Sequence, residues 1–239
     1  ISGTSDAEQV TVRINGVETD APLTDGTFAM DVTLPNISNR IVVTATGANG
    51  VMAVGRYTVN VYGTKIGELT DPTGDDNGPG SYTYPTDGAF NSGSFDLTKF
   101  QVFDDGDTIR FVTSVASDIQ NPWGGNGMST QRVNIYLRDG ESTTTTPLLP
   151  GTNMSASGAW THAIVAVGRD QEAQFGNAIF GSDLERISDV ALDVDPSGHI
   201  ITSVPASALA GIDLQNAQYQ VSMLRHAELG QGIVNVRPY

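Results

Sequence analysis

An acidic loop over residues 71–85 holds the side chains best suited to bind an ion. Three carboxylates, Asp71, Asp75 and Asp76, stand there among Gly and Pro residues that exclude a helix or a central strand. Like charges this close repel each other unless they face water or share a cation. Ca²⁺ takes about 6 to 8 oxygen ligands, and a Gly-rich loop can turn backbone carbonyls toward the ion. We expect either a calcium loop or an Asx-turn loop whose carboxylates bind their own backbone amides.

The spacing within this loop excludes an EF-hand. Thr73 occupies the third position and Asp76 the sixth, where an EF-hand has an oxygen ligand and a Gly. Asp96 stands at the entry to the first long predicted strand, where its side chain could turn back toward the loop. We therefore add Asp96 to the candidate calcium ligands.

A second loop, residues 121–127, places Trp123 between Pro and Gly residues, where no regular strand can continue. The C–H groups of a pyranose stack on an aromatic face, and nearby amides can bind its hydroxyls. Asn121 and Asn126 flank this Trp, so the loop could form a small sugar site.

Trp123 has a structural interpretation as well. A loop Trp can fold back as a lid on a core, and Tyr82 and Tyr84 of the acidic loop are possible packing partners. A binding module would expose Trp123 or the two tyrosines on one face, whereas a structural module would bury them. Trp160 carries the same two interpretations.

Catalysis finds little support in the sequence. The motifs Gly-x-Ser-x-Gly, His-Glu-x-x-His and Gly-x-x-x-x-Gly-Lys are missing, and His162, His199 and His226 lie far apart. The 27 acidic residues make some pair of carboxylates inevitable, so such a pair is no evidence for a glycosidase. Zero cysteines exclude disulfides, thiol nucleophiles and Cys-type zinc sites. We expect a chain without a catalytic site.

Charge and hydropathy exclude two further classes. The formal net charge of −15, with 12 basic residues, argues against a nucleic-acid partner, which needs clustered Lys and Arg. No apolar run of about 18 residues occurs, and the chain begins in a polar segment, so we expect neither a membrane span nor an intact signal peptide. A fragment excised from a secreted protein fits these features.

Two all-β units are predicted along the chain. In residues 1–63, short alternating strands at 10–14, 28–34 and 41–46 are separated by turn signals such as Asn15-Gly16, a pattern typical of a small immunoglobulin-like sandwich. No charged or aromatic cluster stands out there, so we interpret this unit as a spacer.

Residues 64–239 continue in strands, with helix predicted only as single turns near 182–186 and 207–210. Asp104 to Asp107 is predicted to be a hairpin tip, although its acidic residues also allow a metal site. The predicted strands are 100–103, 108–112, 132–137, 162–167, 191–194, 200–204, 219–224 and 232–236.

Ordered motifs over residues 64–239 resemble the C-terminal domain of bacterial glucodextranases. The same kind of domain is similar to modules near the C-termini of amylopullulanases and to family 9 carbohydrate-binding modules. The resemblance implies a non-catalytic accessory domain with a calcium-stabilised loop. The motifs that carry it are 71–85, Gly93-Ser94-Phe95-Asp96-Leu97, Asn121-Pro122-Trp123-Gly124, Ser129-Thr130-Gln131 and 232–238.

The first unit also resembles a known domain, the immunoglobulin-like domain that precedes the C-terminal domain in glucodextranases. The matching features are Asn15-Gly16, Asp25-Gly26-Thr27-Phe28 and the run 42–46, in the same order. Together the two resemblances imply an immunoglobulin-like sandwich followed by a larger, jelly-roll-like antiparallel sandwich of the carbohydrate-binding-module type.

The expected function is that of an accessory region of an extracellular or cell-surface glucan-degrading glycoside hydrolase. It would bind an α-glucan with calcium as cofactor through Trp123, Asn121, Tyr82 and Tyr84. Alternatively, it would be a structural or envelope-anchoring module whose partners are a cell-wall polymer or the catalytic domain of the parent enzyme.

Overall fold

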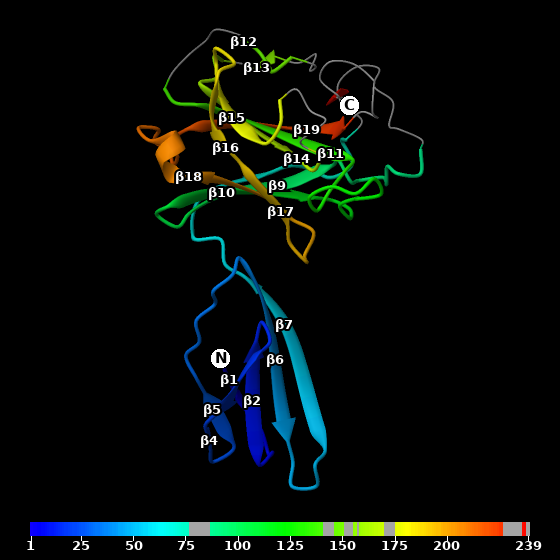
Figure 1. Ribbon diagram of the computed structural model, residues 1–239, viewed down its shortest axis with the longest axis vertical. Helices are drawn as coiled ribbons and strands as arrows, with labels where there is room; N and C mark the ends of the chain where they lie inside the picture. The colour runs from blue at the N-terminus through cyan, green and yellow to red at the C-terminus, as the bar shows by residue number, and fades with distance from the viewer. Residues whose placement is uncertain are drawn as a thin grey trace. The chain divides into compact units, whose positions relative to one another are not determined.

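The structure, a computed structural model, describes residues 1–76, 87–140, 146–150, 155–156, 158–169, 175–226 and 236–237. Its regular elements in these ranges are antiparallel strands, apart from the short 3-10 helix η2 at Ala206–Leu209. The predicted all-β fold class is confirmed. No helix within the described ranges is long and apolar enough to cross a membrane. Two compact units form, Ile1–Tyr62 and Gly63–Tyr239, and each is described by itself (Figure 1).

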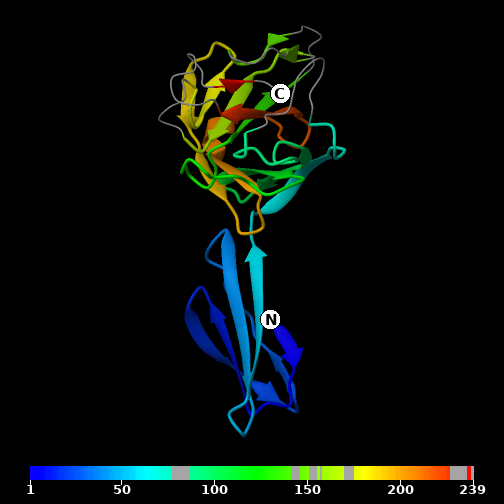
Figure 2. The same ribbon diagram turned by 90° about the vertical axis from the view of Figure 1, so that its right-hand side faces the viewer.

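The first unit consists of two small sheets, one with strand order β3-β2-β6-β7 and the other with order β1-β5-β4. Buried apolar side chains of both sheets form one cluster, in which Val10 and Val12 join Phe28 and Ile41. Figure 2 shows the long β6–β7 hairpin of this unit. The strand bounds are β1 Ser2–Thr4, β2 Gln9–Ile14, β3 Val17–Ala21, β4 Leu23–Thr24, β5 Thr27–Ala29, β6 Ser38–Thr46 and β7 Met52–Asn60.

The Asn15-Gly16 turn forms as predicted. Asn15 and Gly16 have φ angles of 50° and 96° and join β2 to β3, which suits a two-residue type I′ turn. The predicted strand over 28–34 is wrong beyond Ala29, where β5 ends. Met30 and Leu34 pack against the apolar cluster without joining a strand, so their alternation reflects burial alone.

The second unit is a sandwich of a five-stranded sheet, β17-β18-β10-β9-β8, and a six-stranded sheet, β16-β15-β14-β11-β19-β20. A separate two-stranded ribbon, β12–β13, completes the described strands. The bounds are β8 Thr64–Thr70, β9 Leu97–Asp104, β10 Thr108–Val115, β11 Gln131–Arg138, β12 Thr146–Pro147, β13 Ser155–Ala156, β14 His162–Val167, β15 Ala178–Gly181, β16 Arg186–Asp189, β17 Ala191–Val194, β18 Ile200–Pro205, β19 Gln218–His226 and β20 Val236–Arg237.

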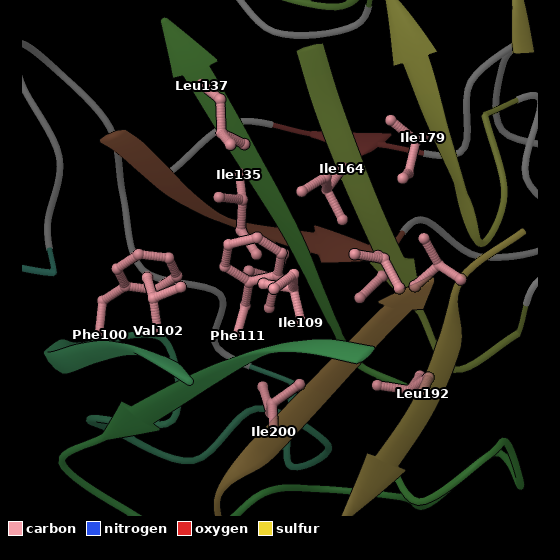
Figure 3. Packing of buried hydrophobic residues seen from close by; sticks show 14 of the residues in the cluster. Phe100, Val102, Ile109, Phe111, Ile135, Leu137, Ile164, Ile179, Leu192 and Ile200 are labelled. Atoms are coloured by element: carbon pink, nitrogen blue, oxygen red, sulfur yellow. The ribbon is translucent and has the colours of Figure 1, made fainter. Parts of the chain in front are cut away.

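The core of this unit lies between its two sheets. Figure 3 shows Phe100 and Phe111 of the five-stranded sheet facing Ile135 and Ile164 of the other sheet. The two Phe rings are stacked with centroids 5.9 Å apart, and each of these four side chains is at most 1% exposed. Apolar side chains at every second strand position therefore supply the main stabilising burial.

A second cluster covers the opposite face of the six-stranded sheet. Tyr136 and Trp160 make an edge-on ring contact at 5.6 Å there, above Ala163 and Val165 of β14. β11 and β14 are consequently buried on both faces, which explains their unbroken buried patterns. Figure 1 shows β12 and β13 on the side of this sheet away from β9 and β10.

The two predicted helical turns have different outcomes. The turn after Pro205 forms as η2. The turn predicted at 182–186 is wrong: a backbone hydrogen bond from Gly181 to Glu185 closes a tight turn, with Leu184 at φ 70°. The hairpin tip predicted at Asp104 to Asp107 joins β9 to β10.

Candidate functional site

Strand pairing brings the two ends of the acidic site together. Asp71 follows the last residue of β8, and Asp96 precedes the first residue of β9. Because β8 and β9 are antiparallel neighbours, the end of one lies beside the start of the other. The backbone N–H of Asp71 donates to the carbonyl of Thr98 at 3.0 Å, which fixes the beginning of the loop.

Asp96 is the most constrained of the predicted ligands. Its side chain is buried, with 3% of the residue exposed, and Oδ2 accepts a hydrogen bond from the Gly74 backbone N–H at 2.7 Å. Gly74 has a φ of 88°, a conformation that Gly adopts without strain. The sequence prediction that Asp96 returns to the acidic loop is therefore matched by the geometry. Oδ1 of Asp96 is buried and has no hydrogen-bond partner.

The negative charge of Asp96 contributes to the raised pKa values of the loop carboxylates Asp71 and Asp76. Burial raises the pKa of Asp71 above its ordinary value, and the charges of Asp75 and Asp96 raise it further. Burial also raises the pKa of Asp76, and Asp96 adds to this, while a backbone hydrogen bond from Gly93 opposes it. Oδ2 of Asp76 is a second buried carboxylate oxygen without a partner.

The chemistry of these residues fits a hard cation. Within the described ranges, no three His, Cys, Asp or Glu side chains come together as a ready-made metal site. The two buried, partnerless oxygens of Asp76 and Asp96 nevertheless offer what Ca²⁺ prefers, and buried polar atoms rarely stay unpaired. The calcium assignment of Asp71, Asp75, Asp76 and Asp96 stays a prediction.

Trp123 lies next to the segment that leads to Asp96. Its ring is half-buried and contacts Phe90 edge-on, with centroids 5.6 Å apart, and Phe90 in turn packs on Phe95 at 6.0 Å. The Trp123 backbone N–H donates to Oγ of the buried Ser129 at 3.1 Å. Two ring contacts thus connect Trp123, through Phe90, with Phe95, the residue that precedes Asp96.

The two asparagines of this loop differ in role. Asn121 is exposed, and its amide donates to the Gly125 carbonyl at 3.1 Å, so it shapes the loop while facing solvent. The Asn126 amide donates to the Leu192 carbonyl at 2.6 Å and thereby ties the loop to β17. Tyr82 and Tyr84, also predicted to contact sugar, lie outside the described residues.

Sequence reasoning missed several residues that position the site. Phe90 supports Trp123, and the Gln131 amide donates to the Ser94 carbonyl at 3.3 Å, which anchors the segment before Asp96 to β11. The Ser129-Thr130-Gln131 motif was available as a signal, because three consecutive polar residues that lead into a buried strand need hydrogen-bond partners.

Two other acidic groups, at the β9–β10 hairpin tip and in the turn before His199, contact neighbours in the sequence. At the hairpin tip, Asp105 forms an ion pair with Arg110, and the Gly106 N–H donates to Asp104 Oδ1 at 2.7 Å, as expected for an ordinary turn. His199 contacts the buried Asp195 at 3.0 Å within one hairpin, and two backbone N–H groups of that turn also donate to Asp195.

The comparison with protein families gives a match over most of the chain. The model of the C-terminal binding module, SLH-like, of glucodextranase matches residues 66–238. Among curated proteins, no relative matches this chain. The suspected relationship to the C-terminal part of glucodextranase is thereby confirmed, and the matched family is a binding module rather than a catalytic domain. The chain therefore belongs to the family of C-terminal, SLH-like binding modules of glucodextranase.

Proposed function

We propose that this chain binds α-glucan as an accessory region of a secreted or cell-surface glucan-degrading enzyme. The observation that carries the proposal is the family match, which covers residues 66–238, nearly all of the second unit, and describes a binding module of a glucan-degrading enzyme. The described geometry agrees with it: a half-buried Trp123 and an exposed Asn121 lie on one loop at the surface. A pyranose ring could stack on the free part of the indole while the amide binds a hydroxyl.

Calcium, in this proposal, stabilises the loops on which recognition depends. Asp71, Asp75, Asp76 and Asp96 would hold the ion, which would supply positive charge where carboxylates now repel one another. Asp96 would connect the ion with the Trp123 loop, because its side chain binds the Gly74 backbone and Phe95 directly precedes it in the chain. A fixed Phe95–Phe90 pair keeps the Trp123 ring in place.

Calorimetric titration tests this function. EDTA-treated, dialysed protein is titrated with CaCl₂, and the calcium-loaded protein is then titrated with dextran and with soluble starch. We expect calcium uptake followed by a saturable heat with at least one glucan. Absence of heat with both glucans at millimolar glucose-unit concentrations contradicts α-glucan binding.

Attachment to the cell envelope is the second candidate function, favoured by the SLH-like character of the matched family. Cosedimentation with purified bacterial cell-wall sacculi separates it from the first. A protein that pellets with sacculi, and gives no heat with either glucan, is an anchoring module. A protein that binds glucan and stays in the supernatant is a carbohydrate-binding module.

A further inference from the structure

The outer face of β11 and β19 carries a stripe of polar side chains. Figure 3 shows Ile135 and Leu137 pointing from β11 into the core, so the alternate residues of that strand lie on the opposite face. Pairing of the two strands sets Asn134 beside Ser222, Tyr136 beside Gln220 and Arg138 beside Gln218. The stripe consists of Arg132, Asn134, Tyr136, Arg138, Gln218, Gln220 and Ser222.

Hydrogen bonds along β11 hold this stripe in one conformation. Arg132 Nε donates to Asn134 Oδ1 at 2.9 Å, and Asn134 Nδ2 donates to the Tyr136 hydroxyl at 3.1 Å. The Leu149 backbone N–H also donates to this hydroxyl, at 3.1 Å. Arg132, Asn134 and Tyr136 are each at most 2% exposed, so the chain of bonds is rigid and shielded from water.

The Tyr136 hydroxyl retains a proton that it can donate. It accepts two hydrogen bonds, and it donates to no group in the described part of the chain. Burial raises the pKa of this phenol above its ordinary value, so it stays protonated near neutral pH. A buried donor of this kind is costly unless a ligand or water accepts from it.

The stripe becomes accessible at its Arg138 end, where a cavity opens. The cavity has a volume of about 50 Å³, enough for a few water molecules or for neighbouring sugar hydroxyls. Tyr136 and Trp160 line it together with Arg138, Gln218 and Gln220. Gln218 is exposed, and Arg138 and Gln220 are half-buried, so a larger ligand can reach them from solvent.

We propose that Arg138, Gln218 and Gln220, beside the Tyr136–Trp160 wall, form a glucan-binding site that takes the hydroxyl edge of an uncharged glucose unit. This inference rests on the proposed function and names a place on the module that is separate from the Trp123 loop. Two amides and a guanidinium on adjacent strands offer both donors and acceptors, which vicinal hydroxyls require.

Charge selects a neutral ligand over an ionic one. Among the described residues that line the cavity there is no carboxylate, so these residues offer a cation no counter-charge. Arg138 is the one charged side chain among them, and it donates to Gln218 Oε1. The net charge of −15 repels anions at long range, so an uncharged glycan meets a smaller barrier than an anionic one.

The test compares three variants by calorimetry with isomaltohexaose and maltohexaose on the calcium-loaded full chain. Gln218→Ala/Gln220→Ala removes two hydrogen-bonding groups from a surface edge, and Gln101→Ala removes an amide from the other sheet as the matched control. Trp123→Ala separates this site from the Trp loop. The melting temperature of each variant verifies its fold.

We expect the double variant to bind about tenfold or more weakly than the unmodified chain, with an unchanged melting temperature, while Gln101→Ala binds normally. The inference is overturned if the double variant keeps full affinity, and a loss of affinity in Trp123→Ala at the same time leaves the proposed function standing. If the unmodified chain binds neither oligosaccharide, the proposed function fails and this site fails with it. If the double variant has a lowered melting temperature, the single variant Gln218→Ala, at an exposed position, replaces it, and its affinity for the two oligosaccharides is judged in the same way.

Discussion

Calcium should raise the melting temperature of the second unit by an amount that can be worked out in advance. Asp76 and Asp96 each hold one buried carboxylate oxygen without a partner, and a bound ion would satisfy both. Extracellular calcium sites have dissociation constants of roughly 10⁻⁴ to 10⁻³ M. At about 10 mM CaCl₂ and a constant near 10⁻⁴ M, ligand linkage stabilises the folded state by about 2.7 kcal/mol.

That free energy translates into a measurable shift. The second unit spans Gly63–Tyr239, and for domains of this size 1 kcal/mol corresponds to about 2 to 4 °C. We therefore expect the transition of this unit to rise by roughly 5 to 11 °C between EGTA and 10 mM CaCl₂. Differential scanning calorimetry measures this directly, because the two units can unfold in separate transitions.

Two variants test whether calcium binding at the acidic loop causes the rise in melting temperature. Burial raises the pKa of Asp71 and Asp76, and the charge of Asp96, which adds to this, is removed in Asp96→Asn, so the calcium-free protein should melt no lower while most of the calcium shift disappears. Asp107→Asn, at the exposed hairpin tip, removes the same charge elsewhere and should keep the full shift. An unmodified protein without a shift, or an Asp96→Asn protein with a full one, would refute the calcium site.

Two further predictions concern pH and the Trp loop. Because burial raises the folded-state pKa of Asp71 and Asp76, folding takes up protons as these groups titrate, and the calcium-free protein should melt higher at about pH 5 than at pH 7. Calcium binds the ionised carboxylates, so the rise in melting temperature that it causes should be smaller at about pH 5 than at pH 7 in thermal melts. A calcium-induced rise that is larger at the lower pH would contradict this prediction. A Cβ at Gly168 would collide with the Met128 carbonyl, whereas a Cβ at Gly88 meets no atom within 4 Å. Gly168→Ala should therefore melt several degrees lower, with altered Trp emission, while Gly88→Ala behaves normally. Equal melting temperatures of the two variants would argue against tight packing beneath the Trp123 loop.

Local sequence patterns predicted much of the fold. Strands at His162–Val167 and Ala191–Val194 have the predicted bounds, because a short run of apolar or β-branched residues between turn formers leaves few alternatives. The prediction failed at residues 30–34, where a period-two pattern reflects burial of an unpaired segment. Pairing depends on distant partners, which a single segment does not reveal.

The candidate site was foreseeable only in part. Asp96 could be grouped with the acidic loop from its place at the entry to a predicted strand, whereas the pairing of β8 with β9 that brings them together was not predicted. The support of Trp123 by Phe90 required the tertiary structure, since 33 positions separate the two rings in the sequence. The polar stripe on β11 was hidden for another reason: β11 is buried on both faces, so its alternation of polar and apolar residues does not mark a surface strand.

Affinity electrophoresis with and without calcium tests whether this chain binds an α-glucan. The calcium-loaded chain is run in native gels that contain no polysaccharide, dextran or soluble starch, beside a protein without sugar affinity. We expect at least one glucan to retard the chain selectively, and EGTA to weaken this retardation. Mobility equal to that of the reference protein in both glucan gels, with calcium present, would contradict an α-glucan-binding module.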